Sequence, residues 1–213
     1  MMSAFSSKYG IFKNKKVMKT SIEAILFLIA SLIVNFYAVL YATERASNSV
    51  TDIVLSNIPP VDVDGIFIYG SFVFWFFVFL ICLYVPRWIP FTAKSIAIFV
   101  LIRSVFISLT HIGPFPTQIP IDPASFINYF SSGGDLFFSA HTGLPFLMAL
   151  IFWKNIKLRY FFLISAVIFG VVVLLGHLHY SIDVISAFFI TYSIFKISEY
   201  IFEEDRKIFF GEI

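Results

Sequence analysis

Two histidines and one aspartate stand between two long apolar runs near the end of the chain, in the stretch HLHYSID at positions 177–183. In a helix that begins here, His179 and Asp183 are four residues apart, so their side chains lie on one face. A carboxylate that accepts a hydrogen bond from one imidazole nitrogen fixes the tautomer and leaves the other nitrogen basic. The spacing therefore predicts a histidine that acts as a nucleophile or general base. A polar helix start at a membrane surface is the plainer interpretation.

The composition is that of a membrane protein. Hydrophobic residues make up 59% of the chain and charged residues 13%, whereas a soluble domain has about 45–50% apolar and about 25% charged residues. Apolar runs of about 20 residues can cross the bilayer core as helices. The single cysteine, Cys82, lies inside such a run, cannot form a disulfide within the chain and is predicted to pack there.

The apolar pattern predicts an all-α membrane protein built as a bundle of six transmembrane helices. The predicted spans cover residues 20–42, 65–85, 91–112, 139–153, 160–175 and 180–201. We expect three parts: a cytosolic basic N-terminus (1–19), one catalytic membrane domain (20–201), and a cytosolic C-terminal tail (202–213) whose mixed charges are solvated.

The basic residues predict how the bundle is oriented. All but three of the 15 basic residues fall on the side that holds both termini. The exceptions are Arg45 on the other side, Arg103 within the third span and Lys196 within the sixth. By the positive-inside rule both termini face the cytosol. The active site is then expected on the exoplasmic side, which is the periplasmic or lumenal side.

Three of the four histidines converge on that exoplasmic side. His141 begins the fourth span, and His177 and His179 precede the sixth. Helix N-termini point to the same region and favour anions. Two histidines beside an orienting aspartate suit phosphoryl transfer, in which one histidine attacks phosphorus and the other protonates the departing oxygen. The position between lipid and water suits a phospholipid head group.

Arg103 lies well inside the third predicted span. A charged side chain at this depth costs a few kcal/mol or more, so it should face the bundle interior and have a partner. Two interpretations are open. Arg103 binds an anionic group of the substrate, or it forms a structural ion pair within the bundle.

Two motifs resemble those of the sphingomyelin synthases. The stretch GDLFFSAHT (134–142) resembles the motif Cys-Gly-Asp-x-x-x-Ser-Gly-His-Thr, with Gly133 in place of the cysteine and Ala140 in place of the second glycine. The stretch HYSIDV (179–184) resembles the partner motif His-Tyr-[Ser/Thr]-x-Asp-Val. The resemblance runs from about Asp52 to Thr191, and this family belongs with the type 2 phosphatidic acid phosphatase superfamily.

The resemblance implies a lipid phosphotransferase. His179 is then the nucleophile that forms a phosphohistidine, Asp183 orients it, and His141 is the general acid and base. The enzyme would move a phosphocholine- or phosphoethanolamine-like head group from a phospholipid donor to a lipid alcohol such as ceramide or diacylglycerol. The residues expected to contact the substrate are Arg103, Asp135, Ser139 and Tyr180. No cofactor, metal or nucleic acid is expected, and the sequence does not indicate an oligomeric state.

Other functions remain open at this point. A lipid phosphatase would use the same three residues with water as acceptor, although the chain has no Lys-x₆-Arg-Pro motif of the ordinary phosphatases. A zinc site built from His141, His177 and His179 is a further alternative. Asp183 would then accept a hydrogen bond from a zinc-bound histidine and would not bind the metal itself. A non-catalytic membrane scaffold is the third alternative.

Overall fold

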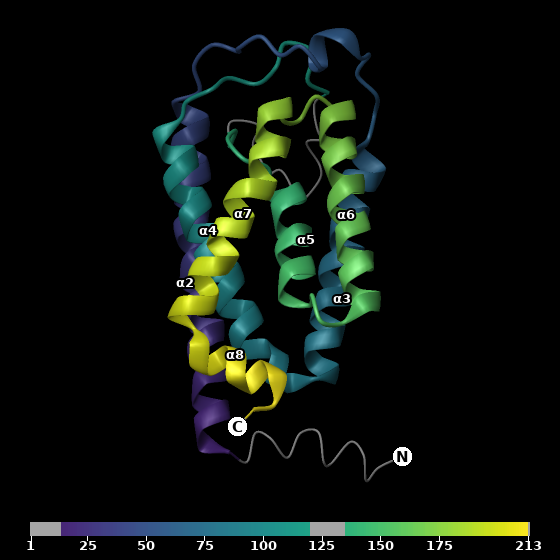
Figure 1. Ribbon diagram of the computed structural model, residues 1–213. Helices are drawn as coiled ribbons and strands as arrows, with labels where there is room; N and C mark the ends of the chain where they lie inside the picture. The colour runs from purple at the N-terminus through teal and green to yellow at the C-terminus, as the bar shows by residue number, and fades with distance from the viewer. Residues whose placement is uncertain (1–13, 120–134, 213) are drawn as a thin grey trace.

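Seven α-helices form the bundle in the computed structural model, which describes residues 14–119 and 135–212 and has no β-strand within them. The helices are α2 (Lys15–Glu44), α3 (Ser71–Tyr84), α4 (Ile89–Leu109), α5 (Ala140–Ile151), α6 (Ile156–Leu175), α7 (Ser181–Ile201) and α8 (Glu203–Phe210) (Figure 1). A π-helical turn, Ile66–Gly70, leads directly into α3. The predicted all-helical fold class is therefore confirmed.

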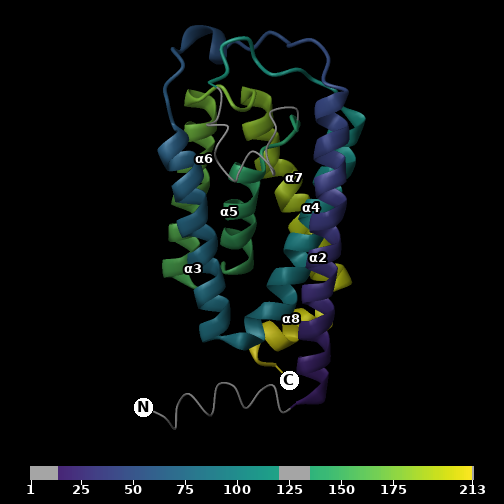
Figure 2. The same cartoon turned by 180° about the vertical axis from the view of Figure 1, so that it is seen from behind.

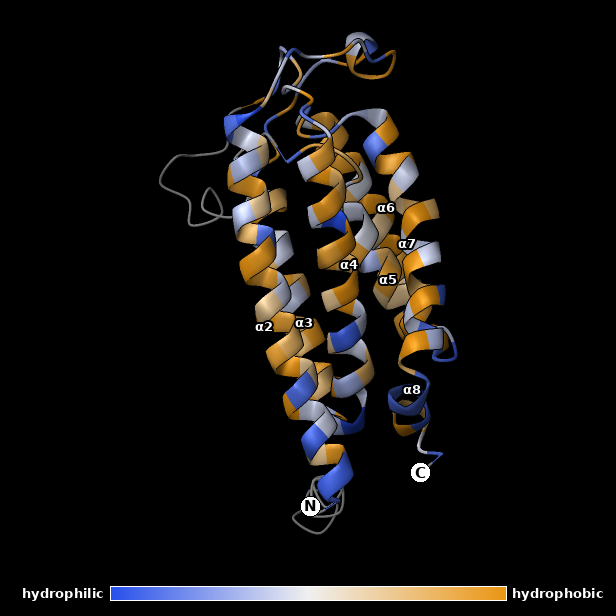
Figure 3. Ribbon diagram, turned by 90° about the vertical axis from the view of Figure 1, so that its left-hand side faces the viewer, coloured by the Kyte–Doolittle hydropathy of each residue, from blue (hydrophilic) through white to orange (hydrophobic). Residues whose placement is uncertain are grey.

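Among the residues that the structure describes, five helical segments are long and apolar enough to cross a membrane. They are Lys15–Glu44, Ile66–Tyr84, Pro86–Leu109, Ile156–Leu175 and Ser181–Ile201. Many of their aliphatic and aromatic side chains point outward, so apolar colour runs along the bundle (Figure 3). An outer surface of this kind is stable in lipid and not in water. The protein is thus an integral membrane protein.

Helix α5 is shorter than the fourth span that the sequence predicts, residues 139–153. It has 12 residues, and a helix of that length rises about 18 Å, well short of a bilayer core of about 30 Å. It packs against α4, α6 and α7 and begins below the ends of α6 and α7 (Figure 1). The close approach needs Gly143, because a Cβ there would meet Phe99 and Thr191 at 2.8 Å. A sixth complete crossing stays a prediction.

Two connecting segments, 46–63 and 110–119, cover the end of the bundle where α7 begins, which we call the loop end (Figure 1). The first contains a short 3-10 helix, Leu55–Asn57. Backbone hydrogen bonds join them to each other, such as Ser47 N to His111 O at 2.8 Å, and to the α6–α7 connection, such as Val61 N to Leu175 O at 2.8 Å. The described chain begins and ends at the opposite end, which we call the α8 end (Figure 2).

The expectation of a solvated C-terminal tail was wrong. Residues 203–210 form α8, and this helix packs across the end of α4. Lys94 of α4 donates to Asp205 at 2.7 Å and to Thr20 of α2 at 2.9 Å, and Asp205 is buried. Phe209 on the same face is also buried. The buried residues of α8 are Asp205, Ile208 and Phe209, so one face of this amphipathic helix covers the α8 end of the bundle.

Candidate active site

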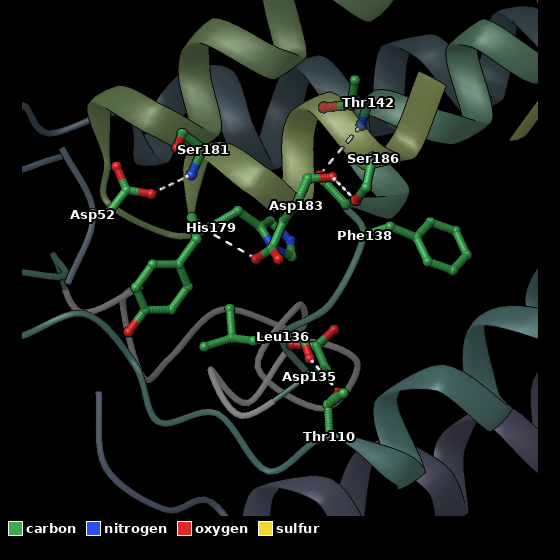
Figure 4. A network of polar contacts seen from close by, with 12 residues as sticks. Asp52, Thr110, Asp135, Leu136, Phe138, Thr142, His179, Ser181, Asp183 and Ser186 are labelled. Atoms are coloured by element: carbon green, nitrogen blue, oxygen red, sulfur yellow. Dashed lines mark hydrogen bonds and ion pairs between the residues drawn. The ribbon is translucent and has the colours of Figure 1, made fainter. Parts of the chain in front are cut away.

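His179 and Asp183 lie together at the start of α7, but only Asp183 is inside the helix, which begins at Ser181. The expectation that one helix carries both side chains was therefore wrong. The His179 Nδ1 atom is 3.2 Å from Asp183 Oδ2, and both side chains are buried (Figure 4). Tyr180 N donates to the same carboxylate oxygen at 3.1 Å. Because an ionised carboxylate only accepts hydrogen bonds, the proton of the neutral imidazole resides on Nδ1. The Nε2 atom then keeps its lone pair and is the nucleophilic or basic position.

Arg103 and Asp135 form a buried ion pair next to this dyad. The guanidinium Nη2 donates to Asp135 Oδ2 at 2.7 Å and to the Asp135 carbonyl oxygen at 2.9 Å, and Nε donates to the Phe138 carbonyl at 3.4 Å. Arg103 therefore also holds the backbone that enters α5. Asp135 and His141 both interact electrostatically with Arg103 and His179. The four ionisable groups thus share one region.

His141 lies in the first turn of α5, on a different helix from His179. Its ring packs on Phe67, with a centroid separation of 4.2 Å and an interplanar angle of 35°. The first residue of α5, Ala140, lies beside it, and both line two cavities. The Ala140 methyl group, which replaces a glycine of the sphingomyelin synthase motif, therefore takes up space next to His141.

The larger of these cavities, about 320 Å³ in volume, lies between α2, α3, α4 and α5. Arg103, Asp135 and His141 line its polar part, and most of the other lining side chains are aliphatic or aromatic. The ribbon view from behind shows α5 in the space between α3 and α2 (Figure 2). A site with a charged end and an apolar remainder suits an amphiphile with a phosphate group.

Sequence analysis missed Asn35, which lines the same cavity from α2. Its side-chain oxygen accepts a hydrogen bond from Ser104 Oγ at 3.4 Å. A detectable signal was present, because Asn35 is the one asparagine in the apolar run 20–42. Polar side chains inside a membrane helix usually face the bundle interior or a cavity.

Ser139 and Tyr180, both predicted to contact substrate, have protein partners in the structure. Ser139 Oγ caps α5 by accepting from Thr142 N at 3.4 Å, and Ser139 N donates to the Asp183 carbonyl at 3.0 Å. Tyr180 OH donates to Gly113 O at 2.8 Å and accepts from Val50 N at 3.1 Å. Ser139 therefore joins the two motif segments, and Tyr180 anchors the second motif to the loop end.

Asp52 is a second residue whose role the sequence did not indicate. Its Oδ2 accepts from Ser181 N, the first amide of α7, at 2.7 Å, and its Oδ1 accepts from Val54 N and Leu55 N (Figure 4). Burial alone would raise the pKa of Asp52, but these backbone donors outweigh it and hold the pKa below the usual value. The carboxylate stabilises the helix start that carries His179.

His177 does not join the other two histidines. Its Nδ1 lies 2.6 Å from Thr117 Oγ1, and its ring contacts Phe115. Its φ of 52° makes the sharp turn before α7. In the described part of the chain no three histidine, cysteine or acidic side chains are grouped as metal ligands. His177 thus belongs to the loop that positions the dyad.

One family model matches the chain. Residues 132–200 match the C-terminal family of the PAP2 superfamily. The match contains His141, His179 and Asp183, and it supports the type 2 phosphatidic acid phosphatase superfamily. It does not distinguish the sphingomyelin synthase branch within that superfamily. A search of curated proteins and a search of solved structures found no match.

Proposed function

We propose that this protein is a lipid phosphotransferase that moves a phospho head group from a phospholipid to a lipid alcohol through a phosphohistidine on His179. The observation that carries the proposal is the buried His179–Asp183 dyad beside a cavity lined by Arg103 and His141. The PAP2 match independently supports phosphatase- or phosphotransferase-type chemistry on a lipid.

In the first half of the proposed reaction, the Nε2 atom of His179 attacks phosphorus. The new P–N bond forms while the P–O bond to the diacylglycerol part of the donor breaks, and His141 gives its proton to the departing oxygen. In the second half, the hydroxyl group of the acceptor attacks phosphorus, the P–N bond breaks, and His141 takes the hydroxyl proton. Asp183 stabilises the positive charge on the His179 ring throughout.

Arg103 is proposed to neutralise the phosphate. Its ion pair with Asp135 keeps a buried guanidinium in place before substrate arrives. A preorganised donor in a site of low dielectric stabilises developing charge without reorganisation. Asp135 offsets part of the positive charge, so a phosphate would share the guanidinium with it.

The choice between transfer and hydrolysis depends on which acceptor reaches His179. Asp183, His179, Arg103 and Asp135 are all buried, and the lining of the cavity favours an apolar acceptor such as ceramide or diacylglycerol. Hydrolysis by water is the second candidate function, and the PAP2 match favours it because this superfamily includes lipid phosphatases. A phosphocholine- or phosphoethanolamine-like head group is proposed from the sphingomyelin synthase motifs.

We also propose that the loop end is exoplasmic and the α8 end cytosolic. The basic residues of the α8 end support this orientation by the positive-inside rule. We further propose three parts of the chain: a cytosolic N-terminus (1–19), a catalytic membrane domain (20–201) and a cytosolic C-terminal segment (202–213).

The test is a head-group transfer assay with purified protein in detergent. Phospholipids with isotopically labelled head groups are supplied with ceramide, with diacylglycerol, or without an acceptor lipid. Label on an acceptor lipid supports transfer, and free phospho head group supports hydrolysis. His111→Gln is a matched control, because it removes a histidine that packs on Tyr41 and has no role in the proposed mechanism. A protein that releases and transfers no label would refute both functions and favour a scaffold.

A further inference from the structure

A separate cavity of about 450 Å³ lies at the α8 end, at the opposite end of the bundle from the dyad. It is open on one side and is bordered by the Pro86–Trp88 turn, the α5–α6 connection and α8, which lie together in Figure 1. Three cationic side chains line it, namely Arg87, Lys154 and Lys157. We call this cavity the basic pocket.

The charge of the basic pocket is not balanced. None of its three cations forms an ion pair with an acidic side chain among residues 14–119 and 135–212. The neighbouring cavity shows the contrast, since there Lys196 and Arg206 both bind Glu199 at 2.8 Å. Like charges gathered without a counter-ion repel each other, so the basic pocket favours an anionic occupant.

The Arg87 side chain has an unused donor. Its Nε is buried and makes no hydrogen bond. The guanidinium packs against Gly211, whose left-handed backbone and missing side chain leave room for it. The rest of the side chain is partly exposed and lines the pocket, so its positive charge is available to an anion there.

The N-terminus of α6 adds further donors. Asn155 caps the helix by accepting from Leu158 N at 3.2 Å, and the first residues, Ile156 and Lys157, line the pocket. Amides in the first turn have no partner within the helix, and the helix dipole is positive there. Free amides of a helix start next to three cationic side chains are an arrangement that binds phosphate.

The rest of the lining is aromatic. Trp88 stacks on Phe209 with a centroid separation of 5.7 Å, and Lys154 Nζ lies 3.9 Å from the centroid of the Phe210 ring. Aromatic rings next to cations are typical of the level of lipid head groups at a membrane boundary.

We propose that the basic pocket binds a phosphate group, carried either by an anionic phospholipid of that leaflet or by a soluble phosphate ester. The aromatic lining favours the lipid. This site is independent of the proposed catalytic function, because it shares no residue with it and lies at the other end of the bundle.

The experiment measures ligand binding to the full chain in detergent, by native mass spectrometry and by the shift of the thermal unfolding midpoint. The probes are phosphatidylglycerol, phosphatidylcholine, glycerol 3-phosphate and inorganic phosphate. The test variant is Lys154→Gln with Lys157→Gln, two exposed residues whose loss leaves the core intact. The matched control is Lys15→Gln with Lys19→Gln, which removes the same charge from exposed positions of α2 at the same end.

We expect the wild type to prefer phosphatidylglycerol to phosphatidylcholine, and the test variant to bind it at least about tenfold more weakly. The control should change affinity by less than about twofold. Arg87→Gln should weaken binding as well. Binding of the soluble esters that disappears in the test variant would support a phosphate site with a soluble ligand. Equal losses in test variant and control, or no preference for any phosphate anion, would overturn the proposal.

Discussion

Replacing Asp183 by asparagine tests how the dyad works. The carboxylate lies 3.2 Å from His179 Nδ1 and accepts from Tyr180 N with the same oxygen. Attack by Nε2 places a positive charge on the imidazole ring. At this distance, an effective dielectric constant of about 20 gives an attraction of about 5 kcal/mol, which corresponds to a factor of about 10⁴ in rate.

Asparagine cannot restore this interaction in either orientation. With its oxygen in the place of Oδ2, the amide nitrogen occupies the position of Oδ1, which is buried and has no hydrogen-bond partner. With the amide rotated, its nitrogen donates to His179 Nδ1, so the imidazole proton moves to Nε2 and the nucleophilic lone pair is lost. Tyr180 N then loses its acceptor as well.

The assay is single-turnover formation of the phosphoryl-enzyme from labelled phospholipid, together with lipid binding. Asp183→Asn should slow formation by about 10³- to 10⁴-fold and leave binding within about threefold. Asp62→Asn is the control, because Asp62 is an exposed carboxylate that accepts a backbone hydrogen bond in the loop segment. A loss of less than tenfold, or weaker binding at an unchanged rate, would refute this account of the dyad.

Three further predictions concern the groups around the dyad. His141→Ala should slow turnover of natural lipids by about 10²-fold or more. It should leave turnover of nitrophenyl phosphate esters unchanged, because their leaving group departs without a proton. Equal losses of rate on both substrates would contradict the role of His141 as general acid. Arg103→Gln should lower the free energy of unfolding by about 3–5 kcal/mol, because it leaves the buried Asp135 carboxylate without its ion-pair partner. Adding Asp135→Asn should restore the thermal unfolding midpoint but not the substrate affinity. If both recover, the ion pair has only a structural role. Asp52 has a lowered pKa, so its stabilising effect is complete at neutral pH and is lost as pH falls below about 3.8. Asp52→Asn should therefore lower the unfolding midpoint at pH 7 and flatten its decline in acid, and an unchanged acid profile would argue against this linkage.

Local spacing predicted the dyad, and apolar run length predicted most of the bundle. His179 precedes α7 and Asp183 lies in its first turn, so their contact depends on the capped helix start, where Tyr180 N donates to Asp183 Oδ2. The five long helices follow from continuous apolar runs. The run at 139–153 forms a helix of 12 residues, and apolarity alone does not distinguish a short buried helix from one that crosses the membrane. Only packing against three neighbours makes α5 a central helix of 12 residues.

Contacts between distant residues were beyond the sequence. The Arg103–Asp135 pair and the Asp52–Ser181 hydrogen bond join segments that only the tertiary fold brings together. Arg103 was expected to have a partner, but nothing in the pattern identified which one. The C-terminal tail was expected to be solvated because it is rich in charged residues. The buried Phe209 side chain and the Asp205–Lys94 ion pair instead hold α8 against the bundle. The Gly133 departure falls outside the described residues.

The central claim is that His179 carries the phosphoryl group. The most direct measurement is mass spectrometry of peptides from protein quenched in alkali during turnover of labelled phospholipid, since phosphohistidine survives base and is lost in acid. We predict a phosphoryl adduct on His179 that is chased by added ceramide or diacylglycerol. It should be absent in His179→Ala and present in the His111→Gln control. An adduct on another residue, or turnover by His179→Ala, would contradict the account.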